Sequence, residues 1–267
     1  MIRSAALACL VLSTLAQAQP AVERPLDRVL TAVDAQGRVD YDRIAAQPAD
    51  LEATLAAVAA QRPSALATDA HKTAFLINAY NAYVLARILN TNARHIERQD
   101  LFEDLFERPV RVAGMRMTLN QLEHGILRRQ SQVDGSPVPR TLFGLRPARL
   151  DPRIHAALNC GAVSCPPLQR RAFRAQTLDR DLEAAFGAFA ASPQAARRDG
   201  GRVILSSLFD WFSADFETGG RALGDIVLDA AGGRQDALRA RLAGRSAEAL
   251  RRDRSVRFAY DWTVHRR

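Results

Sequence analysis

Beyond its N-terminus this sequence has no long hydrophobic run, and it contains few aromatic residues and three cysteines. The missing run argues against a later membrane-spanning helix, which needs about 20 consecutive apolar residues. Aromatic residues make up 6% of the chain and do not alternate with basic ones, so nothing indicates a nucleic-acid surface. The sequence also lacks repeats, low-complexity tracts and a convincing linker, and we therefore predict a single domain.

The first 18 residues have the three parts of a secretory signal peptide. Arg3 supplies the positive charge, residues 5–15 form the apolar segment, and residues 16–18 (AQA) give the small-x-small cleavage pattern. The apolar segment is too short to span a bilayer, and Cys9 lacks the setting of a lipoprotein cysteine. We predict cleavage after Ala18, a secreted or periplasmic protein, and one domain over residues 19–267 with no integral membrane segment.

The net charge of the whole chain is +8, and the arginines are scattered over the sequence. Positive charge can speed encounters with anionic partners, but it says nothing about the fold. An arginine-rich genome would explain the same composition.

Both cysteines of the mature chain lie in residues 151–168 (DPRIHAALNCGAVSCPPL), which we call the cysteine stretch. Small residues surround Cys160 and Cys165, and Gly161 permits a sharp turn between them. One interpretation is a helix end with two buried apolar thiols. A disulfide is a second, because a turn at Gly161 brings together two residues that a continuous helix keeps apart. A third is a reactive thiol that small neighbours leave accessible.

The sequence of residues 71–89 predicts a helix that is more buried than any other of the molecule, because it is apolar on every side. Asn78 and Asn81 are three residues apart and therefore share a face. Buried amides need hydrogen-bond partners. The pair indicates either a functional site or a hub that fixes neighbouring loops.

A second helix, over residues 119–129, is predicted to carry His124 towards the interior. Residues 110–117 alternate around Gly114 as in a β-hairpin, and Thr118 with Gln121 has the spacing of a capping box. On an α-helix Glu123 would face a different direction from its neighbour His124. A lone histidine in such a position is more often structural than catalytic.

The remaining elements are predicted more coarsely. Residues 178–191 form a helix capped by Thr177, residues 203–205 the second strand of a hairpin, and the terminal VRFAYDWTVH a buried strand. Residues 131–150 indicate a surface loop.

Five motifs occur in a fixed order along the chain: AFLINAYNA (74–82), LEHGILR (122–128), the cysteine stretch, FDWFSADF (209–216) and YDW (260–262). In this order they resemble the family called Domain of Unknown Function 547. The resemblance implies an α+β fold that is helix-rich, with a papain-like or transglutaminase-like core and a small antiparallel sheet. It also implies thiol chemistry, with glutathione as a possible substrate. In plant-type members the second cysteine is commonly serine, which implies Cys160 as the nucleophile and His124 as its base.

The residues themselves leave the choice of cysteine open. A nucleophilic thiolate needs a helix N-terminus or a protonated histidine beside it. Cys165 has the first if Ser164 caps a turn that opens with Pro166. Cys160 follows a predicted helix over residues 153–158, at its negative end, and would depend on His124.

We therefore predict a cysteine hydrolase or transferase that needs no cofactor and acts on a small peptide-like or thiol substrate, with Cys160 and His124 as a catalytic dyad. Asn78, Asn81 or Tyr80 would orient the histidine or stabilise an oxyanion. The supporting site residues are Asn78, Tyr80, Asn81, Glu123, Arg153, His155 and Cys165.

Two other functions fit the same residues. One is a non-catalytic periplasmic binding module locked by a Cys160–Cys165 disulfide. The other is a zinc site built from His124, His155, Cys160 and Cys165, although His-x₄-Cys-x₄-Cys is not a familiar zinc spacing. The sequence predicts no nucleic-acid partner and does not decide the oligomeric state.

Overall fold

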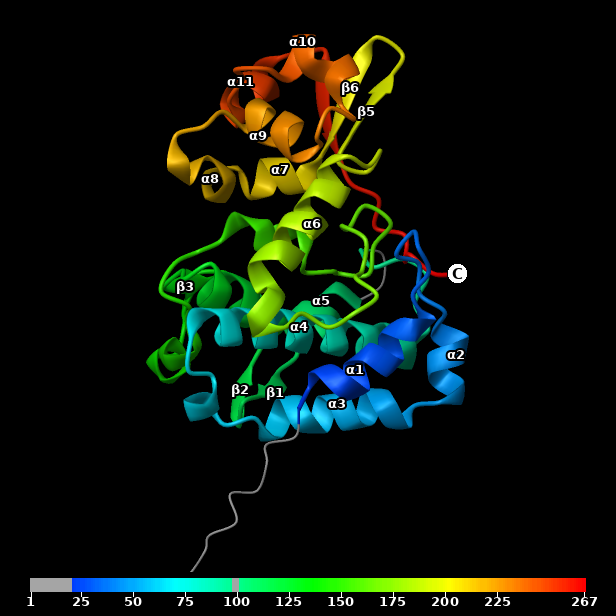
Figure 1. Ribbon diagram of the computed structural model, residues 1–267, viewed down its shortest axis with the longest axis vertical. Helices are drawn as coiled ribbons and strands as arrows, with labels where there is room; N and C mark the ends of the chain where they lie inside the picture. Colours follow the sequence, from blue (N-terminus) through cyan, green and yellow to red (C-terminus); the bar gives the residue numbers. More distant parts are fainter. Residues whose placement is uncertain (1–20, 98–100) are drawn as a thin grey trace, which may run out of the picture.

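The computed structural model describes residues 21–97 and 101–267 (Figure 1). The predicted signal peptide, with Cys9, lies outside the described residues. In the described part no helix combines the length and the hydropathy needed to cross a membrane. The structure is rich in helices and contains small sheets, which confirms the predicted helix-rich α+β class.

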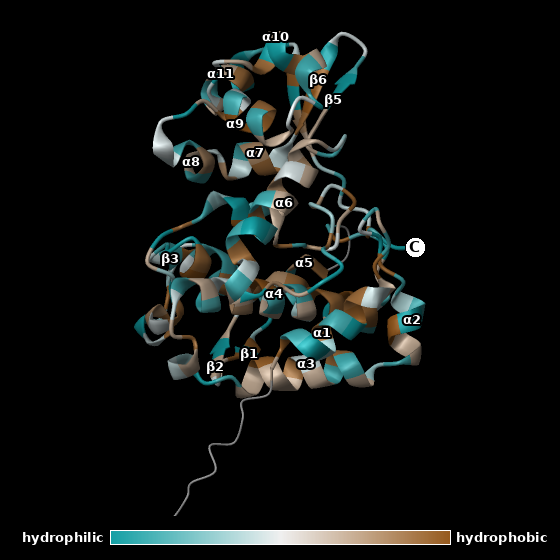
Figure 2. Ribbon diagram, viewed as in Figure 1, coloured by the Kyte–Doolittle hydropathy of each residue, from teal (hydrophilic) through white to brown (hydrophobic). Residues whose placement is uncertain are grey.

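The half of the molecule drawn in the lower part of Figure 1 contains the α-helices between residues 21 and 106. They are α1 (Glu23–Val29), α2 (Tyr41–Ala46), α3 (Ala49–Ala60), α4 (Asp69–Thr91) and α5 (Leu101–Phe106). Helix α4 is central and contacts the other four. Its residues from 73 to 82 are all buried, as its all-round apolar sequence predicted. In Figure 2 hydrophobic segments of α3, α4 and α5 lie together around this core.

The other half contains the remaining long helices and the largest sheet. Its helices are α6 (Leu178–Ala190), α7 (Ser207–Trp211), α8 (Ser213–Phe216), α9 (Leu223–Ala230), α10 (Arg239–Leu242) and α11 (Ala247–Arg252). Its strands are β5 (Ala196–Asp199), β6 (Arg202–Ser206) and β7 (Val256–Ala259). Strand β6 pairs antiparallel with β5 and parallel with β7. The hairpin predicted around residues 199–205 is therefore confirmed, and β7 is half-buried rather than buried.

Two hydrophobic clusters make up the core, and helix α6 belongs to both. Leu178, Leu182 and Ala185 pack into the cluster of the first half. One turn later Phe186 and Phe189 pack into the cluster of the second half. The amphipathic helix therefore joins the two halves through side chains on successive turns.

Two short hairpins complete the sheets, and both are antiparallel. They are β1 (Val110–Val112) with β2 (Met115–Met117), and β3 (Gln132–Val133) with β4 (Ser136–Pro137). The first confirms the hairpin predicted from residues 110–117. The second, with a 3₁₀-helix over Arg140–Leu145, replaces the loop predicted for residues 131–150.

Two local predictions about helix starts are wrong. Helix α6 exists, but the Thr177 hydroxyl donates to the Asp181 carboxylate at 2.5 Å and does not cap the helix backbone. No helix follows Pro166, where the chain is irregular up to residue 174. The Ser164 hydroxyl instead accepts a hydrogen bond from the Asp261 N–H at 2.8 Å, so Cys165 lacks the helix start that would have activated it.

Candidate functional site

The cysteine stretch is held in place by helix α4 on one side. The side chain of Asn81 accepts from the Asn159 N–H and donates to the Ala157 carbonyl, each at 2.9 Å. Asn159 in turn donates to the Pro166 carbonyl and accepts from the Gly161 N–H. These bonds satisfy buried backbone groups and close the chain into a compact turn around the two sulfurs.

The C-terminal segment holds the other side of the same stretch. The N–H groups of Val163 and Ser164 donate to the carbonyls of Thr263 and Asp261, and the His265 N–H donates to the Gly161 carbonyl. The segment therefore runs alongside the cysteines although about 100 residues separate them in sequence. This pairing brings Tyr260 to the sulfurs.

Cys160 and Cys165 form a disulfide, which places the chain in the second of the three states expected for these residues. The Tyr260 hydroxyl lies 3.0 Å from the Cys160 sulfur and 3.1 Å from the Cys165 sulfur. Burial, followed by the negative charge of Glu123, raises the pKa of Tyr260, so its hydroxyl stays protonated and can donate. Cys165 is buried, whereas Cys160 is partly exposed.

His124 lies on a π-helix, η3 (Gln121–Leu127), rather than on the α-helix predicted for residues 119–129. The predicted capping box at its start is confirmed, because Thr118 and Gln121 each bind the backbone N–H of the other at 3.0 Å. A π-helix takes more residues per turn than an α-helix, so neighbouring side chains diverge less. Glu123 and His124 both line the same cavity.

Asp215 of α8 contacts His155 directly and is connected to His124 through Arg128. Its carboxylate receives the Arg128 Nε–H at 2.5 Å and lies 2.8 Å from His155 Nε2. Burial alone would raise the pKa of Asp215, but hydrogen bonds from His155 and Arg128 and the charge of Arg128 lower it to about 2. Asp215 is therefore an ionised acceptor at neutral pH.

The protonation of both histidines follows from these contacts. Asp215 accepts from His155, so Nε2 of that ring carries a proton, and burial lowers the pKa of His155, which keeps the ring neutral. Its Nδ1 has no hydrogen-bond partner among the described residues. Arg128 lies 2.9 Å from His124 Nδ1, and a guanidinium can only donate. The neutral His124 ring therefore carries its proton on Nε2.

Glu123 is a buried carboxylate within the same site. Only 9% of the residue is exposed, and it forms no ion pair within the described chain. Burial is the main cause that raises the pKa of Tyr80, and the charge of Glu123 adds to the shift. Tyr80 therefore stays protonated.

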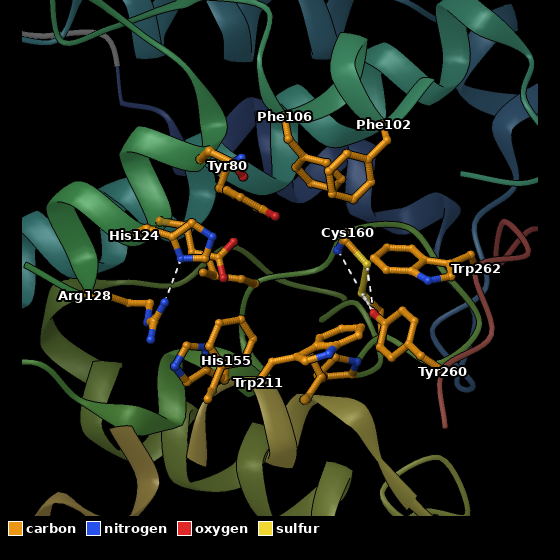
Figure 3. A pocket seen from close by; sticks show the side chains of 17 residues that line it. Tyr80, Phe102, Phe106, His124, Arg128, His155, Cys160, Trp211, Tyr260 and Trp262 are labelled. Atoms are coloured by element: carbon orange, nitrogen blue, oxygen red, sulfur yellow. Dashed lines mark hydrogen bonds between the residues drawn. A yellow bond between two sulfur atoms is a disulfide. The ribbon is translucent and has the colours of Figure 1, made fainter. Parts of the chain in front are cut away.

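These groups line one cavity of about 390 Å³ between the two halves (Figure 3). The polar part of the lining, or polar wall, carries Glu123, His124 and His155. The aromatic wall carries the disulfide and an aromatic cluster of Phe102, Trp211, Tyr260 and Trp262. Ring centroids in this cluster are 4.6 to 5.8 Å apart, and Trp211 is 47% exposed.

The predicted dyad residues share this cavity but lie on different walls of it. In Figure 3 His124 faces Cys160 across the open space. Among the described residues no hydrogen bond joins His124 to a sulfur. The Tyr260 hydroxyl contacts both sulfurs, and the Cys160 N–H donates to the Cys165 sulfur at 2.9 Å. Any direct transfer between the two would have to cross the cavity or pass through a bound molecule.

Asn78, Asn81 and Arg153 lie outside the cavity lining and hold the backbone around it. Asn78 donates to the Phe173 carbonyl at 2.8 Å and accepts from the Phe173 N–H at 2.9 Å. The side-chain amides of both asparagines are thus hydrogen-bonded to the main chain. This favours the interpretation that they fix neighbouring loops over the interpretation that they stabilise an oxyanion.

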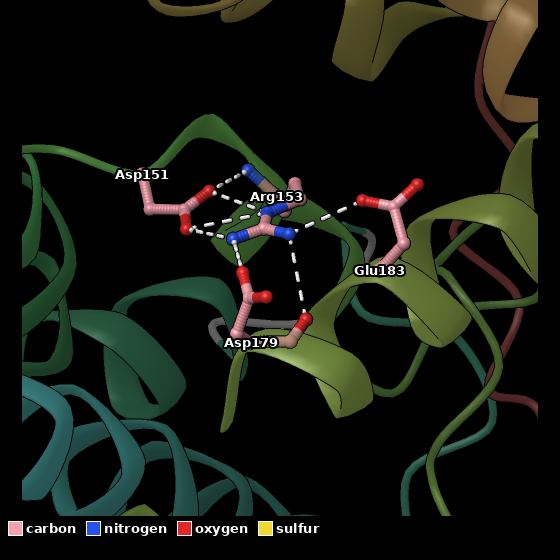
Figure 4. A network of polar contacts seen from close by, with 4 residues as sticks. All are labelled: Asp151, Arg153, Asp179 and Glu183. Atoms are coloured by element: carbon pink, nitrogen blue, oxygen red, sulfur yellow. Dashed lines mark hydrogen bonds and ion pairs between the residues drawn. The ribbon is translucent and has the colours of Figure 1, made fainter. Parts of the chain in front are cut away.

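Arg153 anchors the short 3₁₀-helix Pro152–Ala156 that carries His155 (Figure 4). Its guanidinium contacts Asp151, Asp179 and Glu183, the last two from α6. This 3₁₀-helix replaces the helix predicted over residues 153–158. The contacts fix His155 to α6 and leave Arg153 itself without a place in the cavity.

The zinc site considered from sequence is not formed. The two sulfurs bind each other, and His155 Nε2 binds Asp215, so the four groups do not converge as free ligands. Sequence reasoning missed Arg128, Trp211, Asp215, Tyr260 and Trp262, all of which lie in motifs quoted above. Their order along the chain was visible, but their convergence depends on the fold.

Residues 63–190 match the family described as "Protein of unknown function, DUF547". The match covers α4, η3, the cysteine stretch and α6, and it supports assigning this part of the chain to that family. Trp211, Asp215, Tyr260 and Trp262 lie beyond the matched residues. Searches of curated proteins and of solved structures found no match.

Proposed function

We propose that this protein is an exported, cysteine-dependent enzyme in which Cys160 is the reacting sulfur. The observation that carries the proposal is that a partly exposed sulfur, two histidines and a protonated tyrosine hydroxyl line one cavity. The substrate is a small peptide-like or thiol-bearing molecule, for which glutathione is a candidate. The papain-like relationship is part of the proposal and rests on the resemblance of the motifs.

The disulfide is the oxidised form of the enzyme in this proposal. A substrate thiolate attacks the Cys160 sulfur, forms a mixed disulfide and releases the Cys165 thiolate. A second thiol then releases the substrate as a disulfide and leaves Cys160 reduced. The protein disulfide is the oxidant, so the step needs no other acceptor of electrons.

The reduced enzyme has a nucleophile for acyl transfer. The Tyr260 hydroxyl would donate to the Cys160 thiolate and lower its pKa, because a hydrogen bond to the charged form favours that form. His124 presents Nε2–H in its neutral state and would donate to a developing oxyanion. The base role predicted for His124 requires its Arg128 contact to open.

Labelling with iodoacetamide tests the proposal. We expect no labelling before reduction and, after it, faster labelling of Cys160 than of Cys165, at a pH below that of a free thiol of pKa about 8.5. Tyr260→Phe should move Cys160 labelling to higher pH, and Cys160→Ser should abolish the fast phase. The matched variant Cys165→Ser should keep it. Faster labelling of Cys165 would overturn the assignment.

The second candidate is the non-catalytic binding module, which the disulfide favours. It predicts a disulfide that small thiols do not open in the native protein. Mass spectrometry of the native protein after incubation with glutathione separates the two, because the enzyme should show a glutathione adduct at Cys160. A disulfide that opens only after unfolding would establish the binding module.

A further inference from the structure

The cavity contains a mostly buried side-chain carboxylate, that of Glu123. Glu123 is 9% exposed and forms no ion pair within the described residues. The guanidinium of Arg128, which also lines the cavity, donates to Asp215 through two nitrogens, at 2.5 and 3.2 Å. Burying an unpaired carboxylate is costly, so a bound cation would recover free energy here.

Glu123 lines the cavity together with Tyr80, His155 and Tyr260. Carboxylate oxygens only accept hydrogen bonds, so a group with several N–H donors fits this part of the lining better than a neutral or anionic one.

The aromatic wall provides a second set of contacts for a ligand, in addition to the carboxylate of Glu123. Trp211, Tyr260 and Trp262 line the cavity together with both cysteines, and their ring centroids are 4.6 to 5.8 Å apart. Aromatic rings bind apolar and planar groups and attract cations. A ligand with a positive end and an apolar body would satisfy both walls at once.

We infer that the cavity binds a protonated primary amine at Glu123 and an apolar group against the tryptophans, so that substrates carry a free amino group. The inference rests on the proposed function for its substrate, which would then be an amino-terminal peptide or amino-acid derivative. Glu123 is the specificity-determining residue. N-acylation of the amine removes the charge and leaves the carboxylate unpaired.

The two tryptophans of the chain both line the cavity, so intrinsic tryptophan fluorescence reports on this site alone. We would titrate the oxidised protein with phenethylamine and with N-acetylphenethylamine, which share a ring and differ in charge. We expect the amine to bind at least about tenfold more tightly, a difference of about 1.4 kcal/mol. Glu123→Gln should abolish this preference, and the control Glu52→Gln, at an exposed position of α3, should keep it.

Equal affinity of the two probes for the wild-type protein would overturn the inference, even if Glu123→Gln failed to fold. So would an amine preference that survives in folded Glu123→Gln. The titration uses no thiol chemistry, so its result is separate from cysteine labelling. Fast Cys160 labelling with no amine preference would reject this inference alone, and amine preference with an inert disulfide would reject only the proposed enzyme.

Discussion

Asp215 determines the protonation of side chains that are distant in sequence. It is ionised because Arg128 and His155 outweigh the effect of burial on its pKa, which is about 2. As an acceptor it fixes the proton of His155 on Nε2. It also holds Arg128, whose remaining nitrogen donates to His124. One carboxylate thereby sets which atoms of two rings can take part in hydrogen bonding.

The neutral state of His155 predicts a stability that depends on pH. Burial lowers its pKa in the folded protein, whereas an unfolded histidine has a pKa of about 6.5. Below about pH 6.5 the unfolded chain binds a proton that the folded chain does not, so the free energy of unfolding falls as the pH decreases. His265, whose pKa burial also lowers, acts in the same direction.

The variant His155→Gln tests this assignment, because glutamine can donate to Asp215 without titrating. Its unfolding midpoint should fall less steeply with decreasing pH than that of the wild-type protein, as measured by urea unfolding at several pH values. The remaining slope would belong to His265 and, at more acid pH, to Asp215. An unchanged slope would show that His155 does not stay neutral in the folded protein.

At the scale of elements, the turn at Gly161 and the packing of α4 depend on each other. Gly161 has a φ of +87°, and a Cβ added there would lie 2.1 Å from Ile88 Cδ1. The turn therefore needs both a left-handed backbone and the absence of a side chain. Because Gly161 has no side chain, α4 can pack directly against the turn that carries the two cysteines.

Gly161→Ala should reduce the free energy of unfolding by about 2–4 kcal/mol, from the positive φ and the contact with Ile88 together. Gly200→Ala, at a positive φ with open space around it, should cost only about 1–2 kcal/mol. Adding Ile88→Val to Gly161→Ala should recover part of the loss, because it removes the contacting carbon. Chemical denaturation measures all three, and equal losses at both glycines would contradict the packing argument.

At the scale of the whole molecule, the cavity exists only because two hydrophobic clusters are joined. Helix α6 contributes residues to both, and the C-terminal segment runs from β7 in one half to Gly161 in the other. The residues that line the cavity come from both halves, for example Tyr80 of α4 and Trp211 of α7. Separation of the halves would therefore dismantle the site.

We predict that the two halves unfold in one cooperative transition, which also tests the single domain predicted from sequence. Leu182→Ala and Phe189→Ala, in different clusters, should each lower the free energy of unfolding by about 2–5 kcal/mol and shift the same transition. Circular dichroism and tryptophan fluorescence should give coincident curves. Two separated transitions, with each variant affecting one of them, would show independent halves.

Several elements could be predicted because their signals are local. The all-round apolar sequence of residues 71–89 specified the central helix, and alternation around Gly114 specified the first hairpin. The capping box of Thr118 and Gln121 was visible from spacing alone. Each signal depends only on residues a few positions apart, so it does not depend on the contacts that the rest of the chain makes.

The site itself was decided by contacts between distant residues. Arg128 and Asp215 are hydrogen-bonded although 87 residues separate them in sequence. Tyr260 and Cys160 are in contact at a sequence separation of 100 residues. The sequence named Cys160, His124 and Glu123 as candidates, but it did not show that all three line one cavity. Which of the three states the cysteines adopt, and which carboxylate forms no ion pair among the described residues, depend on how two cores and a returning C-terminal segment pack. No local pattern contains that information.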